Sequence, residues 1–171
     1  DAVRQLTAMR VTSVILTGDN PRTAAAIAGS LGLKFEADMM PEDKLAYIRE
    51  IGTQGGVMMI GDGINDAPAL KQANVGIAIG AGADVAIEVA DVTLVRGELS
   101  KLVEAIRLSK ATFRKILENL FWAWIYNLAA IPIAALGLLH PMVGVVAMTT
   151  SSLTVIGNSL LLKRTQLEVK K

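Results

Sequence analysis

The 171-residue chain contains no cysteine. Without thiols it can form no disulfide, no thiolate zinc site and no cysteine nucleophile. Aromatic residues make up only 4% of the sequence and form no stripe, and the formal net charge is +1. Nucleic-acid interfaces combine strong positive charge with aromatic rings on which bases stack. The low aromatic content and the small net charge therefore do not favour a nucleic-acid interface. We therefore expect no nucleic-acid partner.

Charge is also missing from one long segment. Residues 119–162 contain no Asp, Glu, Lys or Arg, and a membrane-spanning helix needs about 20 apolar residues. The segment is long enough for two such helices, and Gly137, Pro141 and Gly144 predict a turn between them. The alternative is a helical hairpin buried in a large soluble core. We favour two transmembrane helices, because so long an uncharged run is unusual outside lipid.

Basic residues gather on both sides of this uncharged segment and are absent from its turn. The positive-inside rule then places both ends of the segment in the cytoplasm. We expect an integral membrane protein of the plasma (inner) membrane, with the lipid bilayer as its first partner. The flanking basic residues are Lys110, Arg114, Lys115, Lys163, Arg164, Lys170 and Lys171.

The first 98 residues alternate short apolar runs with helical patterns. Such alternation predicts an α/β fold with a parallel sheet covered on both faces by helices. The expected strands are 11–16, 34–38, 57–60, 75–79 and 92–95, and the expected helices are 21–31, a helix from 41, 65–73 and one near 83–89.

Four segments follow from this pattern. Residues 1–98 form the α/β domain, and an amphipathic helix over 99–118 leads towards the membrane without an obvious linker. Residues 119–162 form the transmembrane hairpin and 163–171 a cytosolic tail. The continuous helix is either a connector or a means of transmitting force between the two parts.

Polar residues follow two of the predicted strands, and ligands bind beyond the carboxyl ends of strands in open α/β sheets. Thr17-Gly18-Asp19 comes after the first strand, the run GDGIND (61–66) after the third, and Lys44 lies on the helix between them. A hydroxyl and an amide donate to phosphate oxygens, lysine neutralises charge, and carboxylates hold Mg²⁺. Taken singly, Thr-Gly-Asp is usually a turn and Lys44 a solvated helix residue. Together they predict a phosphate and Mg²⁺ site.

The stretches ILTGDN, PEDK and MIGDGINDAPAL resemble the later motifs of a P-type ATPase phosphorylation domain, which has the haloacid-dehalogenase-like (Rossmann-like) fold. The resemblance implies that Thr17 and Gly18 contact the phosphoryl group and that Lys44 neutralises it. It also implies that Asp62 is a Mg²⁺ ligand. ATP and Mg²⁺ are the cofactors expected of this family.

The same resemblance assigns Asn65 and Asp66 to the shell around metal and phosphate, and places Asp19 close to ATP during domain closure. The family's nucleophile is an Asp in the motif Asp-Lys-Thr-Gly-Thr, and this run does not occur in the sequence. The nucleotide-binding domain that follows it in the family is also absent. We therefore expect this chain to be the C-terminal part of the enzyme, unable alone to form the aspartyl-phosphate, with the upstream remainder as its partner.

The hairpin indicates the transported ion. Met148 offers a soft thioether suited to Cu(I) or Ag(I), and no carboxylate is present for Zn²⁺ or Cd²⁺. Tyr126-Asn127, followed by Met148 and Ser152, resembles the last two helices of copper-transporting P-type ATPases. The resemblance implies that these four residues line the ion pathway, and a copper chaperone is a further expected partner.

Other interpretations stay open at this point. From chemistry alone Met148 could equally face lipid, while Ser151, Ser152 and Asn158 bond neighbouring helices. Two other classes also fit the sequence: a membrane-tethered phosphatase of the haloacid-dehalogenase type, and a non-catalytic membrane partner with a degenerate phosphate site.

Overall fold

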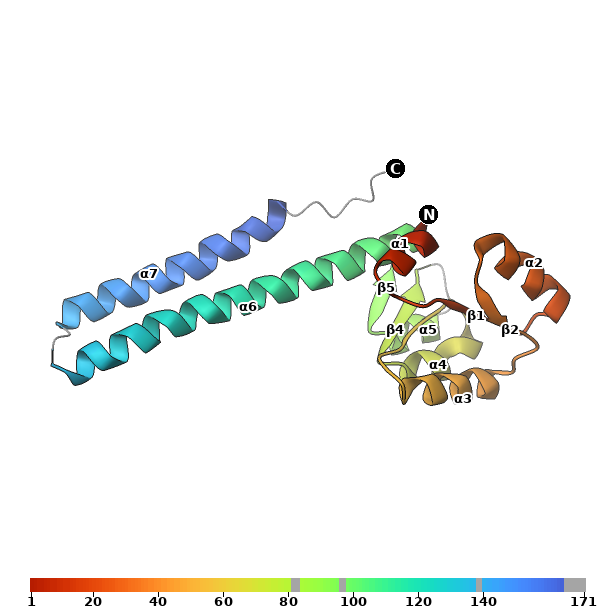
Figure 1. The fold of residues 1–171 in the computed structure, drawn as a ribbon. Coiled ribbons are helices and arrows are strands. Elements are labelled where there is room, and N and C mark those ends of the chain that lie inside the picture. Colours follow the sequence, from red (N-terminus) through yellow and green to blue (C-terminus); the bar gives the residue numbers. More distant parts are fainter. Residues whose placement is uncertain (81–83, 96–97, 138–139, 165–171) are drawn as a thin grey trace. The chain divides into compact units, whose positions relative to one another are not determined.

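The computed structural model describes residues 1–80, 84–95, 98–137 and 140–164 (Figure 1). The chain divides into two compact units, Asp1–Val103 and Glu104–Lys171. The predicted helix near 83–89 is observed from residue 84, and its first residue lies outside the described residues, as does most of the predicted tail.

The first unit alternates strands with helices as predicted, and all of its strand pairs are parallel. A two-stranded sheet has the order β1–β2 and a three-stranded sheet the order β3–β4–β5. The sequence predicted a single sheet, but among the described residues no ladder joins β1 to β3. The strands are β1 (Val14–Leu16), β2 (Lys34–Glu36), β3 (Met58–Gly61), β4 (Val75–Ile79) and β5 (Val92–Leu94).

Helices connect the strands, and local sequence fixes where several of them begin. Asn20 caps α2, because its Oδ1 accepts a hydrogen bond from the Thr23 amide (3.0 Å), and Pro21 and Pro41 occupy first helical turns, where no intrahelical N–H bond is lost. The helices of this unit are α1 (Ala2–Ala8), α2 (Pro21–Leu31), α3 (Pro41–Gly52), the 3₁₀ turn η1 (Ile64–Asp66), α4 (Ala67–Gln72) and α5 (Asp84–Val89).

The core of this unit lies between the sheets and their helices. Ile48 of α3, Met59 of β3 and Leu70 of α4 are buried together, and Leu16 of β1 packs partly against them. Small residues complete this cluster, namely Ala69, Ala78 and Ala86. The small side chains let α4 and α5 approach the sheet closely, which fixes the loop that precedes α4.

Gly76 shows how close this approach is. A Cβ at Gly76 would lie 2.5 Å from the Leu70 carbonyl oxygen, so Gly76→Ala must push β4 away from α4. We expect it to destabilise the chain by about 1–3 kcal/mol, as overpacking does elsewhere. Thermal unfolding of the detergent-solubilised chain measures this. Gly29→Ala is the control, because a Cβ at Gly29 of α2 meets nothing within 4 Å; an equal loss in both variants would contradict the packing account.

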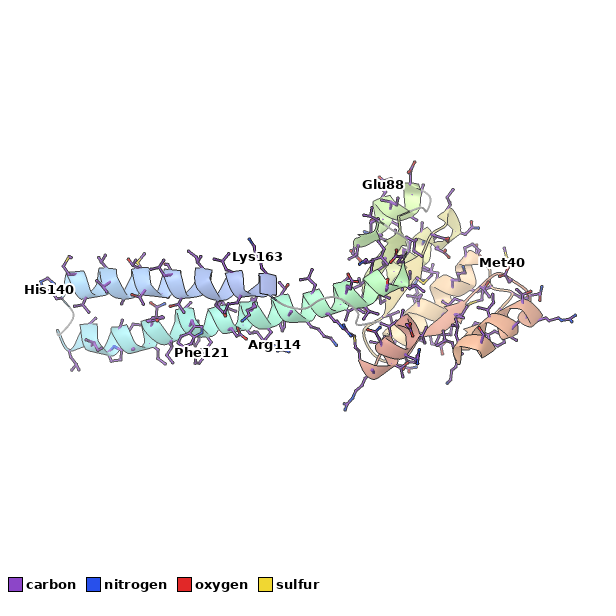
Figure 2. The ribbon with its side chains drawn as sticks, turned by 90° about the horizontal axis from the view of Figure 1, so that it is seen from above. Met40, Glu88, Arg114, Phe121, His140 and Lys163 are labelled. Carbon is purple, nitrogen blue, oxygen red and sulfur yellow. The ribbon has the colours of Figure 1, made fainter. Side chains whose placement is uncertain are left out.

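The second unit is a helical hairpin. Helix α6 (Leu99–Ala135) runs through the predicted connecting helix and the first predicted span without a break. At 37 residues and about 1.5 Å per residue, it is about 55 Å long, against roughly 30 Å for a bilayer's hydrocarbon core. Helix α7 (Pro141–Leu160) returns alongside it and ends in the 3₁₀ turn η2 (Leu161–Arg164) (Figures 1 and 2). Both helices are long and apolar enough to cross a membrane.

The turn between the two helices uses the predicted glycine and proline. Gly137 has φ +70°, a backbone conformation that glycine adopts without strain. His140 caps α7, because its Nδ1 accepts a hydrogen bond from the Met142 amide at 3.3 Å. Pro141 then occupies the first helical position.

Candidate functional site

The loop after β1 is closed by its own threonine. The Thr17 amide donates to the Glu36 carbonyl (3.0 Å), which extends the β1–β2 pairing by one residue. The Thr17 hydroxyl donates to Asp19 Oδ2 (3.0 Å) and accepts from the Asp19 amide (3.1 Å). Two of the predicted site residues are therefore held together in one tight turn at the carboxyl end of β1.

A second loop, between β2 and α3, supports this turn. The Asp38 amide donates to the Asp19 carbonyl (2.8 Å), and the Met39 amide donates to the Thr17 carbonyl (3.0 Å). A Cβ at Gly18 would lie 3.2 Å from the Met39 carbonyl oxygen, so the two loops are in close contact. Sequence analysis did not identify Asp38 or Met39. Asp38 has φ +54°, and aspartate is one of the few residues enriched in that region.

Lys44 and Asp66 form an ion pair at the carboxyl end of β3. Lys44 on α3 places its Nζ 2.7 Å from Asp66 Oδ1 at the end of η1, and the two side chains are 14% and 13% exposed. At this burial the attraction between the charges is screened little by water. The two residues lie 22 positions apart, and the sequence predicted both for the site without predicting their contact.

Gly61 makes this placement of Asp66 possible. A Cβ at Gly61, the last residue of β3, would lie 2.6 Å from Asp66 Cβ and 2.9 Å from Asp66 Oδ2. Real side chains do not approach so closely, so Asp66 occupies space that only glycine leaves free. The first glycine of the run GDGIND therefore has a steric role in the site.

Asp62 and Asn65 are exposed on the same loop, while Asp66 is half-buried. The loop turns sharply, because the Asp66 amide donates to the Gly63 carbonyl (3.1 Å) and α4 begins at Ala67. Among the residues that the structure describes, no three His, Cys, Asp or Glu side chains gather as a metal site. The carboxylates available here are Asp62 and Asp66.

A shallow cavity of about 260 Å³ lies elsewhere in the first unit. Val57 and Asn74 line it just before β3 and β4 begin, so it opens at the amino ends of the strands. Because the candidate site is at the carboxyl ends, we assign the cavity no part in it.

The four residues predicted for the ion pathway lie on both helices of the hairpin. Tyr126 of α6 hydrogen-bonds Thr154 of α7 (3.4 Å). Thr154 already donates its hydroxyl proton to the Thr150 carbonyl (2.8 Å), so Tyr126 is the donor. Asn127 Nδ2 donates to the Ala123 carbonyl (3.0 Å) within α6.

Met148 and Ser152 share one face of α7, four residues apart. The Ser152 hydroxyl donates to the Met148 carbonyl (3.1 Å), and Met148 is 75% exposed. Hydrogen bonds between the described residues do not join this pair to Tyr126 or Asn127.

Comparison with known proteins places the two parts of the chain in one family. Models of haloacid dehalogenase-like hydrolases match residues 1–74 and 51–98. The chain is 53% identical over 97% of its length to a copper-exporting P-type ATPase of Staphylococcus saprophyticus. It is 52% identical over its whole length to one of Staphylococcus aureus. It spans only about a fifth of these relatives, 21% and 22% of their lengths.

A solved structure matches both parts together. The crystal structure of a zinc-transporting PIB-type ATPase in its E2·Pi state superimposes with a TM-score of 0.90 at 44% identity, covering 94% of this chain and 27% of that one. The match extends over the helices as well as the α/β domain, so a soluble hairpin and a membrane-tethered phosphatase fit less well. The chain therefore belongs to the P-type ATPase family and consists of a haloacid-dehalogenase-like domain followed by two transmembrane helices.

Proposed function

We propose that the chain is the C-terminal part of a longer P-type ATPase that couples ATP hydrolysis to export of Cu(I) or Ag(I). The observation that carries this proposal is the Lys44–Asp66 pair beside Asp62. It lies in the same chain as a hairpin that has no charged side chain from 119 to 162 and carries Met148. The copper-exporting relatives of similar sequence support the same function.

The phosphoryl site draws on three loops. The Gly18 amide is a donor for phosphoryl oxygens, and the Thr17 hydroxyl becomes one when it turns away from Asp19, to which it donates its single proton in the structure. The Lys44 ammonium neutralises the charge of these oxygens. Asp19, whose carboxylate accepts the hydrogen bond from the Thr17 hydroxyl, lies near ATP when the domains close. Because the Thr17 turn is bonded to the loop at Asp38, the backbone of this turn is positioned before the substrate arrives.

The carboxylates fit the Mg²⁺ that such chemistry requires. Mg²⁺ prefers hard oxygen ligands and is usually held by one or two carboxylates, with waters and phosphate completing its shell. Asp62 is exposed and Asp66 is anchored by Lys44, so one carboxylate is free to bind and one is fixed. When bound, Mg²⁺ neutralises charge on the transferring phosphoryl group. Asn65 supplies a side-chain amide to the shell around the metal and the phosphoryl group.

The nucleophilic aspartate comes from the rest of the longer enzyme. Strand β1 pairs only with β2, and β3 only with β4, among the described residues. Thr17 follows β1 and Asp62 follows β3, so both unpaired edges lead to the site. We propose that a strand from the upstream part pairs with these edges and brings the aspartate to the phosphoryl site. This strand would join the two sheets into the single one that the sequence predicted.

The transported ion follows from the side chains of the hairpin. Met148 is a soft ligand, and a pathway for Zn²⁺ would be expected to include a carboxylate, which the two helices lack. This favours Cu(I) and Ag(I) over the ion transported by the zinc-transporting relative. We place Tyr126, Asn127, Met148 and Ser152 on the pathway, with both ends of the hairpin in the cytoplasm of a plasma (inner) membrane and a copper chaperone as donor.

ATP hydrolysis by the longer enzyme in detergent and lipid tests this proposal. We expect Cu(I) and Ag(I) to stimulate hydrolysis and Zn(II) and Co(II) not to. Met148→Ala should raise the Cu(I) concentration for half-maximal stimulation at least about tenfold, because even residues that only orient a ligand change metal affinity tenfold or more.

Met142→Ala is the matched control, since Met142 is also an exposed methionine of α7. Stimulation by Zn(II) or Co(II) instead of Cu(I) would keep the P-type ATPase assignment but reject the copper pathway. An equal effect of both methionine variants would reject the role of Met148.

A further inference from the structure

Polar side chains join α6 to α7 at the end of the hairpin where α7 finishes. Lys115 Nζ donates to Glu118 Oε2 (2.6 Å) and to Asn158 Oδ1 (2.9 Å). Asn158 Nδ2 donates to Asn119 Oδ1 (2.9 Å), and Asn119 Nδ2 donates to Ser159 Oγ (2.8 Å). We call these five residues the polar clamp. Figure 2 shows the two helices side by side at this end, near Arg114 and Lys163.

The direction of every hydrogen bond in the clamp follows from Lys115. An ammonium group can only donate, so Asn158 must present its oxygen to Lys115 and its amino group to Asn119. Asn119 must then present its amino group to Ser159, whose hydroxyl donates to the Val155 carbonyl (2.8 Å). Each asparagine uses both its carbonyl oxygen and its amino group, so these hydrogen bonds can form with only one orientation of the two amides.

The clamp is costly to break. Lys115 is 23% exposed and Glu118 38% exposed, and both asparagines are half-buried. Removing one member leaves one polar group of each partner unpaired beside an apolar helix pair, where water replaces the lost hydrogen bond poorly. The clamp therefore favours a single register of α7 against α6.

Helix α6 belongs to both units of the chain, so the register between α6 and α7 matters beyond the hairpin. Leu102 and Val103, in the first turns of α6, are buried and belong to the first unit, and the helix continues unbroken to Ala135. Met148 and Ser152 lie on α7, in the second unit. Among the described residues, the side-chain hydrogen bonds between α6 and α7 are those of the clamp and the bond between Tyr126 and Thr154.

We infer that the clamp makes α6 and α7 move as one body, so that a displacement of α6 driven by phosphorylation also moves Met148 and Ser152. Lys115, Asn119 and Asn158 are then positioning residues for transport. They touch neither the phosphoryl group nor the ion. This inference rests on the proposed function, because it assumes that α6 moves during the ATPase cycle.

The test measures ions transported per ATP hydrolysed by the longer enzyme in sealed vesicles, with Cu(I) as the ion. In Lys115→Met we expect this ratio to fall about three- to tenfold, the equilibrium effect of one interhelical hydrogen bond of typical strength. Formation of phosphoenzyme from ATP should stay within about twofold of wild type, which shows that the variant folds. Lys115→Arg keeps the charge and donors and should retain most of the ratio.

Lys110→Met is the matched control, because Lys110 is an exposed lysine of the same helix outside the clamp. An equal loss in Lys110→Met would assign the effect to surface charge at the membrane and overturn the clamp. A normal ratio in Lys115→Met would also overturn it. Absence of Cu(I)-stimulated hydrolysis in the wild type is a different result, since it rejects the proposed function itself.

A double-mutant cycle gives an independent test. Asn119→Leu and Asn158→Leu each leave the other amide without its partner, whereas the double variant removes both polar groups. We expect the loss in the double variant to be smaller than the product of the two single losses. Losses that multiply would show that the two residues act separately and would overturn the network.

Discussion

Lys44→Met should lower the rate of phosphoenzyme formation in the longer enzyme by about 10²–10³-fold, the range found when one fixed charge-stabilising donor is removed from an active site. The ammonium group of Lys44 is 2.7 Å from Asp66 and only 14% of its side chain is exposed. It is therefore a fixed charge at the carboxyl end of β3, where we place the phosphoryl group. Rapid-quench labelling with radioactive ATP measures the rate.

The same substitution also leaves Asp66 as a half-buried carboxylate without its partner, which destabilises the fold. Lys44→Met combined with Asp66→Asn separates the two effects. The double variant has no unpaired charge, so it should regain thermal stability without regaining phosphorylation. Lys71→Met, at an exposed lysine of α4, should change neither property. Recovery of phosphorylation in the double variant would show that Lys44 acts only by compensating the charge of Asp66 and not on the phosphoryl group.

Much of this site was predictable because its residues follow strands. The periodic apolar runs located every strand of the first unit, although several strands are shorter than expected. The strand predicted over 34–38 ends at Glu36, because Asp38 takes φ +54° and turns the chain into the loop that supports Thr17. Sequence patterns indicate an apolar run, but they do not show where tertiary hydrogen bonds end a strand.

The helix predicted over 65–73 also differs from the structure. It is a 3₁₀ turn over Ile64–Asp66 followed by α4 from Ala67. Pro68 explains the division, because proline lacks an N–H and is tolerated only in the first turn of a helix. The division leaves Asp66 at the junction, where it reaches Lys44.

Contacts between distant residues were the least predictable feature. Lys115 and Glu118 look like the polar face of an amphipathic helix, and Asn119 was notable only as the start of the uncharged segment. The clamp depends on α7 packing against α6 in one register, which no local pattern encodes. One alternative left open was that the polar residues of α7 bond a neighbouring helix. Asn158 does so, because it hydrogen-bonds Asn119 of α6, whereas the Ser152 hydroxyl bonds the Met148 carbonyl of its own helix.

Gly61→Ala should reduce phosphoenzyme formation about 100-fold although it removes no functional group, an effect comparable to the loss of a fixed donor. The added Cβ would lie 2.6 Å from Asp66 Cβ and 2.9 Å from Asp66 Oδ2. Both atoms belong to a side chain fixed by Lys44, so Asp66 must move and Lys44 with it. Displacements of about 1 Å at catalytic groups are sufficient for losses of this size.

Gly63→Ala provides the comparison for this effect, because it changes a glycine of the same loop whose added Cβ would come no nearer than 3.8 Å to Asp66 Oδ2. We expect it to retain phosphorylation within about tenfold of wild type, because 3.8 Å is an ordinary van der Waals distance. Gly61→Ala combined with Asp66→Gly relieves the overlap, because the closest atom to the added Cβ is the Cβ of Asp66, and this double variant should recover stability while remaining inactive. Equal losses in the two glycine variants would mean that loop flexibility, and not the space occupied by Asp66, is what the glycine at position 61 provides. The steric account therefore makes the carboxylate, the lysine and the glycine one unit, in which a residue without a side chain determines where two charged side chains meet.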